Sequence, residues 1–410
     1  MPRRASRWVA GVALGALLAP GVAASGERAL LLGEFLDQHW KTLPLAAQGA
    51  APEDWSPAER SLDPERCGSC HPVQLAQWRD SLHARAYSPG FSGQLVEGKL
   101  AAPDQVRACQ SCHAPLAEQQ AWSASLAPEP DFDPSLRDRG LVCAGCHVRA
   151  HRRFGPPRRP GTAQPGDDAP HAGFTQRTEF QQSRFCAPCH QFFDDPGPNG
   201  KPLENTFREW QASPFAAAGR QCQSCHMPDR AHSWRGIHDP DFVRAAVDVE
   251  LIGSSLEGER IEAGLALRSR DVGHFFPTYV TPRVILALWQ QDGQGHELDD
   301  TRQELTIGRR IDFASQPASE VFDTRVQPGG TARLDYTRPR HARAAELVGR
   351  VTVDPDFHYR GVFESLLETL KDPGARARIR EALQRTSESI FVLSEVRLPL
   401  PPAALQSDRP

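Results

Sequence analysis

Hydrophobic residues follow three different patterns along the chain. Residues 8–19 form a nearly continuous apolar run. Residues 26–245 contain short segments with the apolar spacing of a helix, and residues 72–85 are the clearest of them. From residue 246 onward apolar and polar positions alternate, as they do in strands with one buried face. The pattern therefore predicts an α+β protein, in which a mainly helical domain with little regular sheet precedes an antiparallel β-sandwich-like domain at residues 246–410.

The first apolar run has the layout of a secretory signal peptide. Arg3, Arg4 and Arg7 precede it, and small residues at 22–25 follow it. Because a membrane-spanning helix needs about 20 apolar residues, this run is too short to cross a bilayer. We therefore expect residues 1–25 to be cleaved and the mature chain to be a periplasmic protein without a membrane span.

The alternating segments of the C-terminal part are short and are separated by turn residues. The clearest alternation lies at Val247, Val249 and Leu251, at Ile261, Ala263, Leu265 and Leu267, and at Ala332, Leu334 and Tyr336. Short strands at this spacing predict a sandwich of about seven strands. Two helices are expected before a last strand at 390–393. One covers residues 363–370; the other has Asp372 as N-cap and Pro373 as first helical position and ends near residue 388.

Composition adds two constraints. Proline accounts for 36 residues of 410, about 9% where ~5% is usual, and this argues for many turns and against an all-helical bundle. The formal net charge of -4 argues against a basic nucleic-acid-binding protein, so no nucleic-acid partner is expected.

All ten cysteines belong to copies of one motif, Cys-x-x-Cys-His, which occurs five times. The copies contain Cys67, Cys70 and His71; Cys109, Cys112 and His113; Cys143, Cys146 and His147; Cys186, Cys189 and His190; and Cys222, Cys225 and His226. This motif is the signature of c-type haem attachment. Its two thiols, one helical turn apart, can add to the two vinyl groups of a porphyrin, and the adjacent histidine can bind the iron as proximal ligand.

Other uses of paired cysteines fit the pattern less well. A thioredoxin-like motif normally occurs once in a fold and needs no following histidine. Zinc ribbons use two Cys-x-x-Cys pairs per metal, so that five copies would leave one unpaired. A disulfide framework gives no reason for a histidine after every second cysteine. We therefore expect five covalently attached haem c groups, packed closely enough to form much of the core and to pass electrons between them.

Ten further histidines are available as distal ligands of the five irons. A distal ligand must approach the porphyrin from the face opposite the proximal one, so a histidine on the helix of a motif must serve another haem. His83 follows His71 by twelve residues, about 18 Å along a helix at 1.5 Å per residue. The predicted distal ligands are His83, His151, His232, His238 and His274. Ranked below them are His39 in an amphipathic helix, His171 near a Pro/Gly-rich loop, His296 in a turn, and His341 and His358 in the C-terminal part.

The segments around the motifs resemble a known family. They lie at residues 78–83, 112–116, 185–191, 209–213, 225–228 and 273–278. They are similar to the multihaem c-type cytochromes that include cytochrome c-554 and, more distantly, hydroxylamine oxidoreductase and pentahaem nitrite reductase. The resemblance implies stacked, mostly bis-histidine haems in a helical domain whose distal-ligand segment extends to residue 278. It also implies that His83, His238 and His274 occupy distal-ligand positions.

Two departures from the family weaken an enzymatic interpretation. Pentahaem nitrite reductases of the usual kind have a lysine in place of one motif histidine, whereas all five are histidine here. The cross-linked tyrosine of hydroxylamine oxidoreductase has no recognisable match among Tyr87, Tyr279, Tyr336 and Tyr359.

The leading hypothesis is therefore an electron carrier between a quinol-linked donor and a terminal reductase or oxidase. An alternative is an oxidoreductase that acts on a small nitrogen or sulfur species at a haem with an open sixth position. A third hypothesis is a non-catalytic subunit whose β-domain docks it into a respiratory assembly. The sequence identifies no catalytic residue and no oligomeric state.

Overall fold

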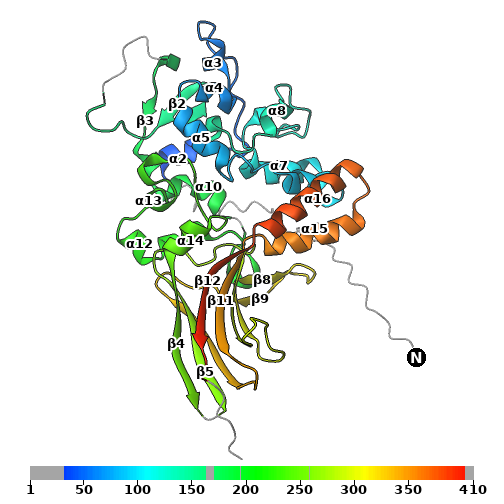
Figure 1. Ribbon diagram of the computed structural model, residues 1–410. Coiled ribbons are helices and arrows are strands. Elements are labelled where there is room, and N and C mark those ends of the chain that lie inside the picture. Colours follow the sequence, from blue (N-terminus) through cyan, green and yellow to red (C-terminus); the bar gives the residue numbers. More distant parts are fainter. Residues whose placement is uncertain (1–31, 163–169, 194, 258, 402–410) are drawn as a thin grey trace, which may run out of the picture.

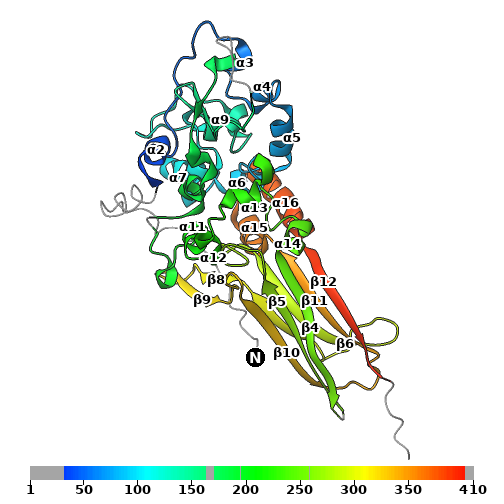
Figure 2. The ribbon, with the colours of Figure 1, turned by 90° about the vertical axis from the view of Figure 1, so that its left-hand side faces the viewer.

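The computed structural model describes residues 32–162, 170–193, 195–257 and 259–401, so the expected signal peptide at residues 1–25 lies outside the described residues. The chain forms an elongated molecule with short helices at one end and long strands at the other (Figures 1 and 2). The predicted mixed α+β fold is confirmed. Among the described residues, no helix has the length and apolar character that a membrane span requires.

The helical end consists of short helices joined by turns and 3-10 segments. The helices are α2 (Glu34–His39), α3 (Pro57–Arg60), α4 (Pro64–Gly68), α5 (Pro72–Asp80), α6 (Pro89–Gln94), α7 (Pro103–His113), α8 (Pro134–Arg137), α9 (Cys143–His147), α10 (Ala187–His190), α11 (Thr206–Gln211), α12 (Pro214–Ala217), α13 (Cys222–His226) and α14 (Pro240–Ala246). A small sheet joins β1 (Val148–Arg149), β2 (Arg152–Gly155) and β3 (Thr175–Gln176). Many of these helices begin with proline, whose fixed φ suits the first helical position, and this use accounts for part of the proline surplus.

The helix expected at residues 72–85 is shorter than its apolar spacing predicts. α5 ends at Asp80, because Ser81 takes an extended conformation and its hydroxyl donates to the carbonyl of Trp78 at 2.7 Å. His83 therefore lies in the following turn rather than about 18 Å along a helix axis.

The other end of the molecule is built from long antiparallel strands. They are β4 (Val247–Glu257), β5 (Arg260–Ser269), β6 (Arg283–Gln291), β7 (Gln303–Ile307), β8 (Arg309–Asp312), β9 (Ser319–Asp323), β10 (Thr331–Pro339), β11 (Glu346–Asp354) and β12 (Phe391–Pro399). One sheet has the order β10-β5-β4, another β12-β11-β6-β7, and β8 pairs with β9. The last strand is longer than the expected segment at 390–393.

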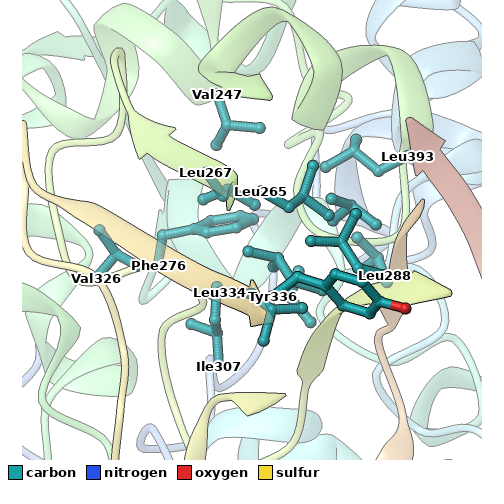
Figure 3. Packing of buried hydrophobic residues seen from close by; sticks show 14 of the residues in the cluster. Val247, Leu265, Leu267, Phe276, Leu288, Ile307, Val326, Leu334, Tyr336 and Leu393 are labelled. Atoms are coloured by element: carbon teal, nitrogen blue, oxygen red, sulfur yellow. The ribbon is translucent and has the colours of Figure 1, made fainter. Parts of the chain in front are cut away.

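The two larger sheets share one hydrophobic core (Figure 3). Leu265 and Leu267 of β5 and Leu334 of β10 meet Leu288 of β6 in this core. The buried phenol of Tyr336 accepts a hydrogen bond from Gln290 Nε2 at 3.1 Å, so its polar atom has a partner inside the core. Alternating residues of the two sheets thus point inward, as in a sandwich.

Two C-terminal helices pack against the helical end of the molecule. These are α15 (Phe357–Thr369) and α16 (Pro373–Glu388); α16 packs against α15 and against α6 (Figure 2). A Cβ atom at Gly90 in α6 would lie 2.6 Å from Cζ of Phe363, so only glycine permits this approach. The Glu97 carboxylate also accepts hydrogen bonds from the backbone N–H groups of Lys371 and Asp372, at 2.9 and 2.8 Å.

Candidate haem-binding site

Each Cys-x-x-Cys-His motif forms a single helical turn. Four of the motifs end helices, α7, α9, α10 and α13, at their histidines. In the first motif, the N–H of His71 donates to the carbonyl of Cys67 at 2.9 Å, which closes the same turn. All ten cysteines lie in the described part of the chain, and none of them forms a disulfide. Both thiols of a motif and its histidine are therefore held together by local backbone structure.

Three motif histidines have the orientation of metal ligands. Their Nδ1 atoms are hydrogen-bonded to backbone carbonyls: His113 to Ala86 at 2.7 Å, His147 to Phe154 at 2.8 Å and His226 to Arg235 at 2.7 Å. A carbonyl only accepts, so Nδ1 must carry the proton. The lone pair of Nε2 is then left for a metal.

Three histidines predicted as distal ligands lie opposite motif histidines. The ring centres are 6.4 Å apart for His83 and His190, 6.2 Å for His147 and His232, and 6.3 Å for His226 and His274. A metal–imidazole bond is about 2 Å long and the ring centre lies ~1 Å beyond the nitrogen, so two imidazoles on opposite sides of one ion have centres about 6 Å apart. The spacing of all three pairs fits an iron between them.

The hydrogen bonds and burial of these distal histidines also fit a haem iron. Nδ1 of His232 is bonded to the carbonyl of Arg230, and Nδ1 of His274 to that of Phe275, both at 2.9 Å. Burial lowers the pKa of His83 to about 3, and it also lowers the pKa of His232 and of His274. These rings are therefore held in the neutral form that binds metals.

The structure places two other predicted ligands, His151 and His238, away from any motif histidine. Nε2 of His151 is hydrogen-bonded to the carbonyl of Gly49 at 2.8 Å, and Nε2 of His238 contacts both oxygens of Asp356 at 3.0 Å. The nitrogen that a distal ligand needs is already engaged in both cases. The geometry therefore does not support these two predictions, because folding turns both rings toward other parts of the chain.

His171, which sequence analysis ranked low, comes close to the first motif. Its Nδ1 is bonded to the carbonyl of Gly173 at 2.8 Å, so Nδ1 carries the proton and the lone pair of Nε2 is left for a metal. Burial, and then the charge of His171, lower the pKa of His71. No local pattern signals this approach, since it joins segments about a hundred residues apart.

The chain is similar to known multihaem cytochromes. The cytochrome c554 and c-prime family matches residues 66–148, which include the first three motifs. Cytochrome c-554 of Nitrosomonas europaea is 25% identical over 136 residues, 31% of this chain and 55% of that protein. The crystal structure of a penta-haem cytochrome c552 from Thermochromatium tepidum superposes with a TM-score of 0.61 at 20% identity, over 84% of this chain and 100% of that one.

The chain is a multihaem c-type cytochrome. The matched region spans only 55% of the length of the curated relative. The likeness to the penta-haem cytochrome, at 20% identity, concerns the fold.

Contacts between thiols give the order of the attachment sites in the cytochrome. The Cys67 thiol lies close enough to that of Cys143 to affect its ionisation, and the same holds for the thiols of Cys112 and Cys189 and of Cys186 and Cys222. Cys146 also lies within electrostatic range of the Cys186 and Cys189 thiols. The first site therefore adjoins the third, the third adjoins the fourth, and the fourth adjoins both the second and the fifth.

The second motif of the cytochrome differs from the others in its surroundings. The ring of His113 stacks on Phe91 at 4.1 Å, and no other histidine among the described residues lies opposite it at the spacing of the three pairs. Tyr279 and Tyr359 are hydrogen-bonded to each other, and the nearby Cys109 contributes to raising the pKa of both. Tyr87 packs on Phe91 at 5.3 Å, so three of the four tyrosines of the chain lie around this motif. Sequence reasoning had given these tyrosines no role.

Proposed function

We propose that this cytochrome is an electron carrier that holds five haem c groups through its five motifs. The observation that supports the proposal is the continuous series of thiol contacts between motifs. Haems attached at neighbouring sites would lie close enough for electrons to hop between them. The fourth site, which adjoins three others, would be the branch point of the array.

The proposed ligands follow from ring spacing for three pairs and, for the fourth, from the electrostatic effect of His171 on His71. Ten cysteines would form the thioethers, with proximal ligands His71, His113, His147, His190 and His226. The proposed axial pairs are His190 with His83, His147 with His232, His226 with His274, and His71 with His171. Relative to the sequence-based set, His171 enters, while His151 and His238 leave.

The haem groups would supply one-electron redox chemistry, and the protein would tune and protect it. Carbonyl partners for Nδ1 hold six of the proposed ligands as the neutral tautomer: His113, His147, His171, His226, His232 and His274. Burial of rings such as His190 excludes water from the ligand positions, and it lowers the pKa of that ring.

We further propose a periplasmic location and a division of the mature chain into residues 26–245, which carry the haems, and residues 246–410. The location is inferred from the signal-like residues 1–25, and haem c attachment is consistent with it. The partners would be redox proteins, with a quinol-linked donor and a terminal reductase or oxidase on either side.

Haem stoichiometry and stepwise reduction test the carrier proposal. The purified protein should contain five haem irons per chain, and a reductive titration should take up five electrons. Fewer than five irons would mean that a motif is not loaded. In His171→Ala, one further iron should become high-spin in electron paramagnetic resonance; an unchanged spectrum would remove His171 from the proposed set.

The unpaired His113 favours a second candidate function, an oxidoreductase that acts on a small nitrogen or sulfur species at the second haem. An open iron needs an acid or base beside it. Glu204 and the hydroxyls of Tyr279 and Tyr359 are candidates in this region. Burial raises the pKa of Glu204 to about 7. The charge of Glu204 in turn contributes to raising the pKa of both tyrosines. Oxidised wild-type protein should then show a high-spin ferric signal from one haem in five. A purely low-spin spectrum would exclude this candidate and leave the carrier proposal intact.

A further inference from the structure

The segment that carries His274 is attached to the β-sheet end of the molecule. It lies between β5 and β6, and Phe276 pairs with Val326, which follows β9. The N–H of each residue donates to the carbonyl of the other at 2.8 Å. The ligand segment of the fifth site is therefore tied to the residues that immediately follow β9.

A buried ion pair lies at this attachment point. Nη1 of Arg325 donates to Glu209 Oε1 at 2.8 Å, and the two side chains are only 1% and 4% exposed. Nε and Nη2 of the same guanidinium donate to both oxygens of Asp323, at 2.8 and 2.9 Å. Glu209 belongs to α11 of the helical end, whereas Arg325 and Asp323 belong to the β-sheet end. The guanidinium thus joins the two ends in a fixed, planar geometry.

Glu209 connects this ion pair to the segment that carries His274. Its second oxygen, Oε2, accepts hydrogen bonds from the N–H of Phe275 at 3.2 Å and from Thr278 Oγ1 at 3.3 Å. The carbonyl of the same Phe275 accepts the Nδ1–H of His274 at 2.9 Å. The guanidinium also lies over the Phe275 ring, 5.1 Å from its centre. A continuous series of contacts therefore runs from Arg325 through Glu209 and Phe275 to the imidazole.

We propose that Arg325 is a positioning residue for the distal ligand of the fifth haem, and that holding this ligand is a function of the β-sheet end of the molecule. The inference rests on the proposed pairing of His226 with His274. Without the guanidinium, Glu209 would be buried without a cation and would draw in water or a proton. Either change weakens the hydrogen bond between Glu209 and the N–H of Phe275. The imidazole of His274, which is bonded to the carbonyl of Phe275, is then less firmly held in position.

Arg325→Gln tests this proposal through spectroscopy and not through electron-transfer activity. The expected result is a loss of low-spin signal from one haem, with a matching high-spin signal in the oxidised protein. Carbon monoxide should also bind one further haem per chain in the reduced protein, because a released imidazole leaves the iron open. Arg325→Lys keeps the charge but loses the planar fork, and should give an intermediate loss.

Arg309→Gln is the matched control. Arg309 is also buried, pairs with Glu320 at 2.8 Å and donates to the carbonyls of Pro202 and Lys201, but none of these contacts involves the ligand segment. Its loss should lower stability without changing any haem spectrum. An equal spectral change in both variants would mean general loosening of the fold and would overturn the positioning role.

His274→Ala distinguishes a wrong pairing of His226 with His274 from a wrong role for Arg325. If this variant keeps the wild-type spectrum, the pairing of His226 with His274 is wrong. If it opens one haem while Arg325→Gln does not, the pairing stands and the positioning role of Arg325 is refuted. Haem content is measured on every variant, so that loss of the carrier function through unloaded motifs is recognised separately.

Discussion

Replacing Glu204 by glutamine is expected to raise the stability of the protein above neutral pH and to leave it unchanged in acid. The carboxyl group accepts hydrogen bonds from the N–H and the hydroxyl of Thr206, at 3.1 and 2.5 Å. Burial raises its pKa from 4.5 to about 7; the charge of Glu209 acts in the same direction and that of Arg325 in the opposite one. Glutamine can accept the same hydrogen bonds, so that the substitution removes the charge and little else.

The size and sign of the effect follow from the change in pKa on folding. One pKa unit corresponds to about 1.4 kcal/mol, so a shift from 4.5 to about 7 amounts to about 3 kcal/mol. The folded protein binds the proton of Glu204 more tightly than the unfolded chain does. The contribution of this group to stability is therefore fully present below pH 4.5 and is lost as the pH rises through about 7. The variant lacks this loss and should be more stable by about 3 kcal/mol at alkaline pH.

Denaturant unfolding of the haem-loaded protein, followed by circular dichroism across this pH range, measures the difference between the two proteins. The curves of unfolding free energy against pH should meet in acid and diverge through neutrality. Glu364→Gln, at an exposed position of α15, is the control and should follow the wild type within about 0.5 kcal/mol. Parallel curves for wild type and Glu204→Gln would refute the reasoning, because they would mean that Glu204 ionises as easily in the folded protein as in the unfolded chain.

Two further substitutions test the ligand geometry and the packing between the two ends. His83→Ala should convert one low-spin haem to high-spin and add one carbon monoxide site per chain, whereas His151→Ala should leave the spectra unchanged; the opposite pattern would contradict the assignment. Gly90→Ala should destabilise the protein by about 1–3 kcal/mol in denaturant unfolding, because the added methyl group would lie 2.6 Å from the Phe363 ring. Gly236→Ala is its control, since a Cβ there meets nothing within 4 Å, and equal effects of the two changes would rule out the steric explanation.

Parts of the fold that depend on local patterns agree with the structure. The alternating residues around Leu265 and Leu334 lie in β5 and β10 and point into a shared core. The expected cap at Asp372 is present, with its carboxylate accepting the N–H of Ala375 at 2.5 Å. The length of α5 was overestimated, because apolar spacing does not register that Ser81 can end a helix by bonding to the carbonyl of Trp78.

The sequence by itself determined the chemistry of attachment, because both thiols and the histidine of each motif lie within one helical turn, and a turn depends only on neighbouring residues. It could not decide which distant histidine faces which motif. His171 and His151 are both candidate ligands in the sequence, and only folding brings His171 within electrostatic range of His71, while Nε2 of His151 is hydrogen-bonded to Gly49. In the same way, nothing near Arg325 in the chain points to Glu209, more than a hundred residues away. Tertiary structure decided these contacts, because each joins segments that are far apart in the sequence and come together only when the chain folds.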